Sequence, residues 1–293
     1  MKTATRSAYF AGSRARVSKR TAGIVACLCM LIYVLLSPVV AMPLYSKLLL
    51  FYPWKYPSGY YDQARTRDIS PEDVYFRSAN GNRLHGWYYH KPQCSKTLIV
   101  HHGQGANVSA CQFLAGMFLD CDVNVLLYDY QGFGRSEGEP SIEGLLENGL
   151  SAFDFVCEGR KVPSKNIINC GESLGTGVAA YVTEKRTCGG LILYSPYASL
   201  IDCAKQRYPF LLVYPRFMFP VRELECRTCV AGSHPPLLLV HGTLDQVISI
   251  SNSDELFAMA TSPKKYMRIE NDYHDPTNWN YQPAFKGFIN SLK

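Results

Sequence analysis

From residue 97 onward, short apolar runs alternate with longer amphipathic stretches, and this alternation constrains the fold more than any other feature of the sequence. The apolar runs are rich in Val, Ile and Leu and predict buried strands. The candidate strands are 97–103, 124–130, 166–171, 191–197, 236–242 and 265–271. Helical spacing is found between and after them, at 109–119, 142–157, 174–185, 251–260 and 282–292. Alternating strands and helices predict an α/β fold, with a mostly parallel central sheet covered by helices on both faces.

Two stretches depart from the alternation. DVYFRSANGNRLHGWYYH, at 73–90, predicts an antiparallel hairpin at one edge of the sheet, because Asn80-Gly81 is a strong two-residue turn signal. The stretch at about 201–235 has Tyr, Pro, Phe and Arg in no clear period and predicts a small cap insertion between two strands. In sheets of this kind, functional sites lie beyond the carboxyl ends of the strands, so the residues that follow each strand are the candidates.

The run GESLG places Ser173 between Gly171 and Gly175, directly after a predicted strand and before a predicted helix. This strand–turn–helix context predicts a nucleophile elbow, a turn so tight that the residues two before and two after the serine must be small. The helix that follows would favour negative charge developing near its N-terminus. An ordinary glycine-rich turn is the alternative interpretation.

A serine nucleophile needs a base, and the base needs a carboxylate that orients it. In such a sheet the chain order is serine, acid, histidine. His274, in NDYHD, lies in a loop after the last strand and is the predicted base, whereas His241 lies within a strand and is predicted to be packed structurally. Asp245, in HGTLDQV, comes three residues after the strand that ends at Gly242 and is the predicted acid.

Acyl transfer also needs donors for the oxyanion, each worth about 2.7–4 kcal/mol. The residue after the nucleophile supplies one backbone N–H, that of Leu174. The loop HHGQGAN follows the first long parallel strand and predicts the second donor, the backbone N–H of Gln104. A simple strand-terminating turn is the alternative for this loop.

Six motifs occur in a fixed order along the chain: HHGQGAN, YDYQGFGRSEG, GESLG, YSPYASL, HGTLDQV and NDYHD. Together they resemble the α/β-hydrolase fold. More narrowly, they are similar to the membrane-associated α/β-hydrolase-domain proteins, which include lysophospholipid and monoacylglycerol lipases and protein depalmitoylases. The resemblance runs from about Val74 to the C-terminus, and it implies the same nucleophile, acid, base and oxyanion donors as the residues already named. It implies no metal and no organic cofactor.

The net charge of +6 comes from the first twenty residues. The basic residues there are Lys2, Arg6, Arg14, Arg16, Lys19 and Arg20. The rest of the chain has 24 basic and 24 acidic residues, so the charge is no argument for nucleic-acid binding.

After this basic tail, no charged residue occurs between Arg20 and Lys47, a gap of 26 residues that exceeds the roughly 20 needed to cross a bilayer as a helix. We therefore expect a cytoplasmic tail at 1–20, a transmembrane anchor at 21–46, a linker at 47–72 and a hydrolase domain at 73–293. The basic flank predicts that the tail stays cytoplasmic and the domain is exoplasmic. The alternatives are a secretory signal cleaved near Ala41 and a buried core helix.

Cys226 and Cys229 form a lone C-x-x-C, with too few further ligands nearby for zinc. A structural disulfide and plain buried thiols both remain open for this pair. An exoplasmic domain would favour some disulfide pairing among the cysteines.

The sequence thus predicts a serine hydrolase of carboxylic esters or thioesters, with lipid-like acyl substrates. The cap stretch YPFLLVYPRFMFP, at 208–220, could line a lipid tunnel, contact a bilayer or simply pack, and Arg216 and Arg222 could face phosphate groups or solvent. A serine peptidase of the same fold and a catalytically silent scaffold are the alternative functions.

Overall fold

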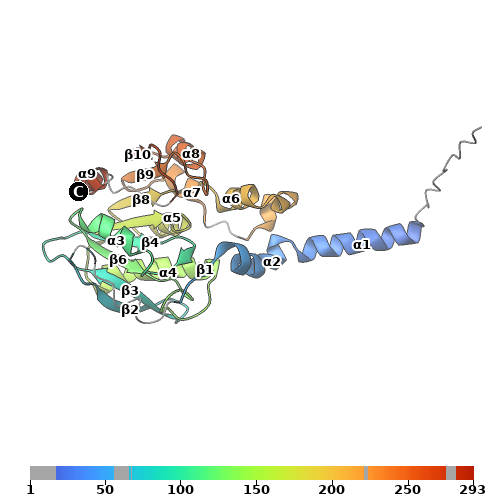
Figure 1. The fold of residues 1–293 in the computed structure, drawn as a ribbon, viewed down its shortest axis with the longest axis horizontal. Helices are drawn as coiled ribbons and strands as arrows, with labels where there is room; N and C mark the ends of the chain where they lie inside the picture. The colour runs from blue at the N-terminus through green and yellow to red at the C-terminus, as the bar shows by residue number, and fades with distance from the viewer. Residues whose placement is uncertain (1–17, 56–65, 67, 221–223, 275–281) are drawn as a thin grey trace, which may run out of the picture.

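The computed structural model describes residues 18–55, 66, 68–220, 224–274 and 282–293. Most of the basic tail, part of the predicted linker, and Arg222 and Glu223 of the cap lie outside these residues. The predicted α/β architecture is confirmed, with a central sheet between two layers of helices (Figure 1).

The central sheet has eight strands in the order β10-β9-β8-β7-β4-β6-β3-β2. Their bounds are β2 Glu72–Arg77, β3 Arg83–Tyr89, β4 Thr97–His101, β6 Asn124–Tyr128, β7 Ile167–Glu172, β8 Gly190–Tyr194, β9 Leu237–Gly242 and β10 Lys264–Ile269. The strand β3 runs antiparallel to both of its neighbours, and every other pair in the sheet is parallel. The predicted hairpin and the six predicted strands are therefore all present.

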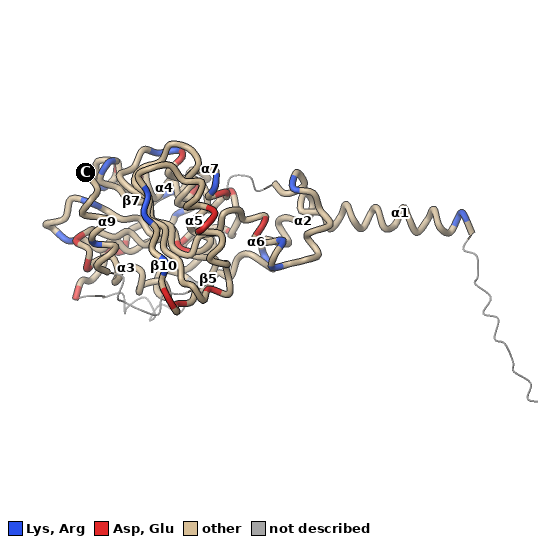
Figure 2. The backbone as a smooth tube through the Cα atoms, turned by 90° about the horizontal axis from the view of Figure 1, so that it is seen from above, with Lys and Arg blue, Asp and Glu red and all other residues tan. Residues whose placement is uncertain are grey.

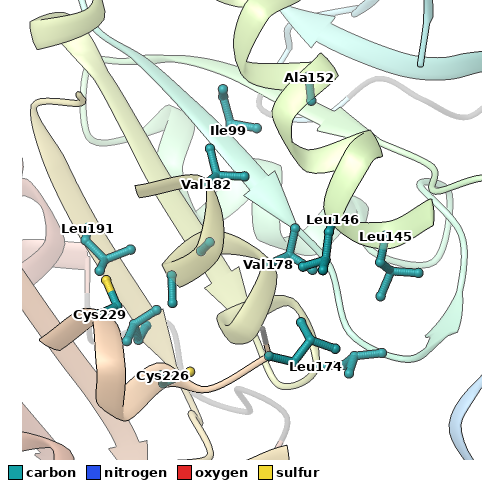
Figure 3. Packing of buried hydrophobic residues seen from close by; sticks show 14 of the residues in the cluster. Ile99, Leu145, Leu146, Ala152, Leu174, Val178, Val182, Leu191, Cys226 and Cys229 are labelled. Atoms are coloured by element: carbon teal, nitrogen blue, oxygen red, sulfur yellow. The ribbon is translucent and has the colours of Figure 1, made fainter. Parts of the chain in front are cut away.

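Each face of the sheet has its own core. On β4, Ile99 packs in one cluster while Leu98 and Val100 pack in the other, because successive side chains of a strand point to opposite faces. The helices of the first face are α4 Ile142–Asp154, α5 Gly175–Lys185, α7 Cys226–Ala231 and α8 Ser251–Met259. The second face is covered by α3 Gln112–Leu119 and α9 Gln282–Ser291. Figure 3 shows the first core, where side chains from α4, α5, α7, β4 and β8 meet.

The range predicted as a cap contains α6 Leu200–Arg207, the 3-10 turns η5 Pro209–Val213 and η6 Arg216–Met218, and then α7. The helix α7 packs against α5 and α8 and so belongs to the layer that covers the sheet. The helix α6 and the two 3-10 turns instead lie beside the N-terminal helices (Figure 1). We call these three elements the cap.

The apolar N-terminal segment forms two helices, α1 Lys19–Leu35 and α2 Pro38–Tyr45, followed by a π-helical turn η1 Ser46–Leu50. No single helix in the described part of the chain is long and apolar enough to cross a membrane, but the pair Lys19–Leu35 and Pro38–Leu50, bent by 51°, meets both criteria together. The break falls at Ser37, whose extended backbone (φ −69°, ψ 149°) is the conformation that a following proline favours. The single transmembrane helix expected over 21–46 is therefore not what the structure contains. None of the residues of α1 is buried, and α1 projects from the body of the molecule (Figures 1 and 2).

A two-stranded parallel ladder joins the N-terminal segment to the hydrolase domain, and the sequence did not predict it. The strand β1 Tyr52–Pro53, in the predicted linker, pairs with β5 Gly105–Ala106. Because β5 lies in the loop HHGQGAN, the linker contacts the predicted oxyanion loop.

All eleven cysteines are free thiols in the structure. Cys226 and Cys229 are buried on α7, which decides between the two alternatives for this pair in favour of buried thiols. No disulfide supports the expectation of cysteine pairing. Among the described residues, no group of three or more His, Cys, Asp and Glu could hold a metal ion.

Candidate active site

Ser173 lies at the tip of a tight turn between β7 and α5, with a φ of +52° that is rare for a residue with a side chain. Its N–H donates to the carbonyl of Tyr194 at 3.0 Å. A Cβ at Gly171 would lie 2.4 Å from the Gly175 carbonyl oxygen, and one at Gly175 would lie 1.9 Å from the His101 carbonyl oxygen. Only glycine fits at either position, which is the steric requirement of a nucleophile elbow.

The structure brings the three predicted triad side chains together. His274 Nε2 lies 2.9 Å from Ser173 Oγ, and His274 Nδ1 lies 2.7 Å from Asp245 Oδ2. Because a carboxylate only accepts, Nδ1–H donates to Asp245, and Nε2 is left to accept from the serine hydroxyl. This is the tautomer that a general base needs.

Asp245 is buried and held by four donors. Its Oδ1 accepts from the backbone N–H groups of Val247 at 2.8 Å and Ile248 at 2.9 Å, while its Oδ2 faces His241 and His274. Burial alone would raise the pKa of Asp245, but the hydrogen bonds from the two histidines outweigh it and hold the pKa well below its usual range. Asp245 is therefore an anion at any pH at which the site could work.

His241 has a part in the site that sequence reasoning missed. It is fully buried, as expected for a packed strand residue, but its Nε2 lies 3.0 Å from Asp245 Oδ2 and 2.9 Å from the Ile248 carbonyl. Both partners accept, so Nε2 carries the proton, and Nδ1 accepts from the Ser253 hydroxyl at 2.7 Å. The signal in the sequence was the spacing of four residues between His241 and Asp245 across the end of β9.

The loop that carries His274 is held against two strand ends. Ser195, directly after β8, donates its hydroxyl to the His274 carbonyl at 3.2 Å and itself has a φ of +46°. At the end of β9, a Cβ on Gly242 would lie 2.4 Å from the Asp272 carbonyl oxygen. The loop can therefore approach the sheet closely only because residue 242 is glycine.

The histidines before the oxyanion loop are structural. His101 and His102 are both fully buried, and burial lowers the pKa of His101 to about 3 and also lowers the pKa of His102. His101 Nδ1 lies 2.8 Å from the Tyr128 hydroxyl. Both imidazoles are neutral at physiological pH and are engaged within the core, so neither competes with His274 for the role of base.

A cavity of about 310 Å³ opens at Ser173. It is lined by Leu49, Leu50, Tyr52, Gln104, Ser173, Leu174, Tyr197, Leu200, Cys203, Ala204, Arg207, Tyr208, Gln246, Val247 and Ile248. The two predicted oxyanion donors, Gln104 and Leu174, thus share one cavity with the predicted nucleophile. Among the described residues that line it there is no Asp or Glu.

Cys203 is the other nucleophilic side chain of this cavity. Burial, and then the nearby carboxylate of Asp202, raise the pKa of its thiol to about 12. A thiol that stays protonated is a poor nucleophile. Ser173, with a base 2.9 Å away, is the better candidate.

The structure places the two candidate phosphate-binding arginines elsewhere. Arg216 forms ion pairs with Asp202 of α6 and with Glu225, directly before α7, both at 2.8 Å, so two carboxylates balance its charge. Arg222 lies outside the described residues.

Known proteins are similar to this chain in sequence and in fold. The sequence profile described as "Serine aminopeptidase, S33" matches residues 92–218. The protein YfhR of Salmonella typhimurium is 31% identical over 233 residues, which cover 73% of this chain and 78% of YfhR. The alpha/beta hydrolase domain-containing protein 17C of Mus musculus is 26% identical over 239 residues, 78% of this chain and 70% of that protein. The Pyrococcus furiosus esterase Pf2001 has a similar structure, with a TM-score of 0.65 at 16% identity over 83% of this chain and 98% of the esterase.

The strand order and the elbow are those of a hydrolase built on a mostly parallel sheet. The chain belongs to the α/β-hydrolase family. At 16% identity the esterase contributes the fold alone.

Proposed function

We propose that this protein is a serine hydrolase that cleaves carboxylic esters or thioesters through an acyl-enzyme on Ser173. The observation that carries the proposal is the unbroken set of hydrogen bonds from Ser173 through His274 to Asp245. A hydrolase of this fold needs these three groups, in this chain order and within hydrogen-bonding distance.

In the proposed reaction, Ser173 Oγ attacks the substrate carbonyl while His274 Nε2 takes its proton. The backbone N–H groups of Gln104 and Leu174 stabilise the oxyanion. The imidazolium then gives its proton to the leaving alcohol or thiol, and Asp245 stabilises its positive charge. Water, activated by the same imidazole, attacks the acyl-enzyme and releases the acid.

Lipid-like acyl groups are the substrates that the surroundings of the site favour. The cavity beside Ser173 is lined by Leu49, Leu50 and Leu200. The cap exposes large apolar side chains, among them Leu212 (64% exposed) and Phe217 (71% exposed). Contiguous exposed apolar surface is typical of a site that meets a membrane or an apolar ligand.

We further propose that α1 and α2 anchor the protein in a membrane, with the tail cytoplasmic and the catalytic domain exoplasmic. Two observations support the anchor: α1 has no buried residue, and the chain has no charge between Arg20 and Lys47. The basic tail supports the orientation. Secretion after cleavage near Ala41 is the alternative.

A peptidase is the second function to weigh, because the matching profile is named for an aminopeptidase. Such an enzyme needs a carboxylate to hold the substrate ammonium group. None lines the cavity among the described residues, and Glu225 of the cap region is engaged by Ser199 and Arg216. The structure therefore favours an esterase, and aminoacyl p-nitroanilides should not be hydrolysed.

The test of the proposal is hydrolysis of p-nitrophenyl esters of increasing chain length by the full-length protein in detergent. We expect wild type to hydrolyse them, with the highest kcat/KM on long chains, and Ser173→Ala to lose activity by about 10⁴-fold or more. Equal activity in the two proteins would contradict the proposed nucleophile. A preference for short chains would contradict the lipid-like substrate but not the mechanism.

A further inference from the structure

A second, smaller pocket of about 70 Å³ lies beside the catalytic cavity, between the N-terminal segment and the cap. It is lined by side chains of residues 42–50, by one face of α6, and by Tyr208, Leu211 and Phe219. The two tyrosine hydroxyls are used elsewhere, since Tyr45 donates to the Leu36 carbonyl and Tyr208 to the Leu49 carbonyl. The pocket thus offers a bound molecule little besides hydrocarbon contact.

The small pocket and the catalytic cavity share part of their walls. Five residues line both: Leu49, Leu50, Leu200, Ala204 and Tyr208. On α6, Leu200 and Ala204 are four residues apart, so they lie on one face of the helix, and Tyr208 continues that row just past its end. One side of the shared wall is therefore a face of α6, and the other side is Leu49 and Leu50 of η1. Ala204 has the smallest side chain in this wall.

We propose that the small pocket receives the distal part of the substrate's acyl chain, so that residues 42–50 form one wall of the acyl-binding site. The inference rests on the proposed function, because the acyl group must be attached at Ser173 for its chain to run along this wall. An apolar chain suits the pocket because moving methylene groups out of water is favourable. The N-terminal helices then determine which chain lengths are accepted, in addition to any part they play in anchoring.

Ala204→Phe in the full-length protein tests this proposal. Ala204 lines both pockets, so a phenyl group at this position takes up space where the two meet. If the acyl chain runs along this wall, the ratio of kcat/KM for a sixteen-carbon ester to that for a four-carbon ester should fall by about tenfold or more. Ser46→Phe, which narrows only the small pocket, should lower the same ratio and serves if Ala204→Phe does not fold. Leu44→Phe is the matched control, because Leu44 lies on α2 two residues before Ser46, is 51% exposed and lines neither pocket. Its ratio should stay at the wild-type value.

A folded Ala204→Phe or Ser46→Phe protein with the wild-type ratio would overturn the acyl-binding pocket. So would an equal loss on short and long esters. A wild-type protein that hydrolyses no ester of any length would instead overturn the proposed function. The two failures are therefore distinguishable.

A different observation concerns the oxyanion loop. Gln104 lies between Gly103 and Gly105, and two glycines give this part of the backbone wide conformational freedom. Hydrogen bonds from another segment are needed to hold it in one conformation. The N-terminal segment provides two links: the Tyr52 N–H donates to the Gln104 carbonyl at 2.9 Å, and Asn107 Nδ2 donates to the Trp54 carbonyl at 2.8 Å. We infer that Tyr52, through its backbone N–H, is a positioning residue for the oxyanion donor at Gln104.

Tyr52→Pro removes this donor, together with the Tyr52 side chain that lines the catalytic cavity. Phe51 already has the extended backbone (φ −108°, ψ 128°) that a residue before proline adopts. With the loop less well placed, we expect kcat on a short ester to fall by about ten- to a hundredfold, below the 10²–10³ of losing an oxyanion donor outright, with little change in KM. Tyr52→Ala loses the same ring but keeps the N–H, so its kcat should lie well above that of Tyr52→Pro.

If Tyr52→Pro does not fold, Asn107→Asp tests the second link. The carboxylate cannot donate to Trp54, but it still accepts from Ser109 as Asn107 Oδ1 does now. The same kcat-selective loss is expected. A wild-type kcat in folded Tyr52→Pro, or an equal loss of kcat in Tyr52→Ala, would overturn the inference.

Discussion

At the scale of single residues, the site is a row of five side chains rather than three. Hydrogen bonds join Ser173 to His274, His274 to Asp245, Asp245 to His241 and His241 to Ser253. The last two residues contact no substrate. His241 donates a hydrogen bond to the buried carboxylate of Asp245, and Ser253 holds His241 in place. Without such partners, burying the charge of Asp245 would be unfavourable.

His241→Phe should lower kcat by about ten- to a hundredfold with little change in KM, because a carboxylate placed less firmly orients His274 less well. It should also lower the free energy of unfolding by about 1–3 kcal/mol, the cost of leaving a buried acceptor without its donor. Steady-state kinetics and urea unfolding measure the two effects. His234→Phe is the control, since His234 is half-buried and its one hydrogen bond within the described part of the chain joins it to the neighbouring Pro235 carbonyl. A wild-type kcat in His241→Phe would contradict the proposal that His241 helps Asp245 to orient His274.

The lowered pKa of Asp245 predicts a pH dependence of stability. A carboxyl whose pKa is lower in the folded than in the unfolded state, where it is about 3.9, stabilises the protein above that value and loses this contribution as the pH falls through the folded pKa. The Tm should therefore fall more steeply below about pH 4 in wild type than in Asp245→Asn. Parallel Tm curves for the two proteins would contradict the prediction.

The predicted triad could be located from the sequence because its chemistry demands a set chain order and a set place, the strand ends. The partners of these residues could not. His241 and Ser195 act through contacts with Asp245 and His274 that depend on how strand ends meet across the sheet. Arg216 looked like a free cation in the sequence, but two carboxylates from other parts of the fold neutralise it.

At the scale of elements, central strands such as β4 and β6 were predictable because every one of their residues is buried. Leu98, Ile99 and Val100 of β4 are all fully buried, and such a run has no competing interpretation of similar length. The sequence also contains a signal for the break between α1 and α2, the pair Ser37-Pro38. The prediction of one helix gave more weight to the unbroken apolar segment on either side of it. The two-residue strands β1 and β5 have no pattern at all, because they are defined only by their pairing.

The core between α4 and α5 gives a prediction about stability. Leu145 is fully buried on α4, so Leu145→Ala should lower the free energy of unfolding by about 2–5 kcal/mol through lost burial and a residual cavity. Urea unfolding measures it. Glu143→Ala, at an exposed position of the same helix, should change stability by less than about 1 kcal/mol. A similar small change in Leu145→Ala would contradict the packing described for this core.

At the scale of the whole molecule, the N-terminal helices, the cap and the active site form one continuous arrangement. The ring of Tyr33 on α1 lies 4.8 Å from that of Tyr214, and Tyr45 on α2 contacts Phe210 of η5. The cap thus bridges the exposed apolar helix α1 and the cavity at Ser173 (Figure 1). The exposed apolar surface of the cap therefore lies next to the site for which we propose apolar substrates.

The exposed cap residues give a prediction about membranes. Leu212→Glu with Phe217→Glu places two charges on the apolar surface without touching either pocket. We expect the protein reconstituted in phosphatidylcholine vesicles to hydrolyse vesicle-borne esters more slowly, because charged side chains resist leaving water. The rate on a water-soluble ester should not change. Unaltered hydrolysis of vesicle-borne esters would contradict a membrane contact by the cap.

The central claim is that Ser173 is an activated nucleophile, and a fluorophosphonate probe tests it most directly. The probe forms a covalent adduct with an activated serine, and peptide mass spectrometry locates the adduct. We predict one adduct, on Ser173, in wild type and none in Ser173→Ala. An adduct on another residue, or no adduct on a folded wild-type protein, would contradict the account.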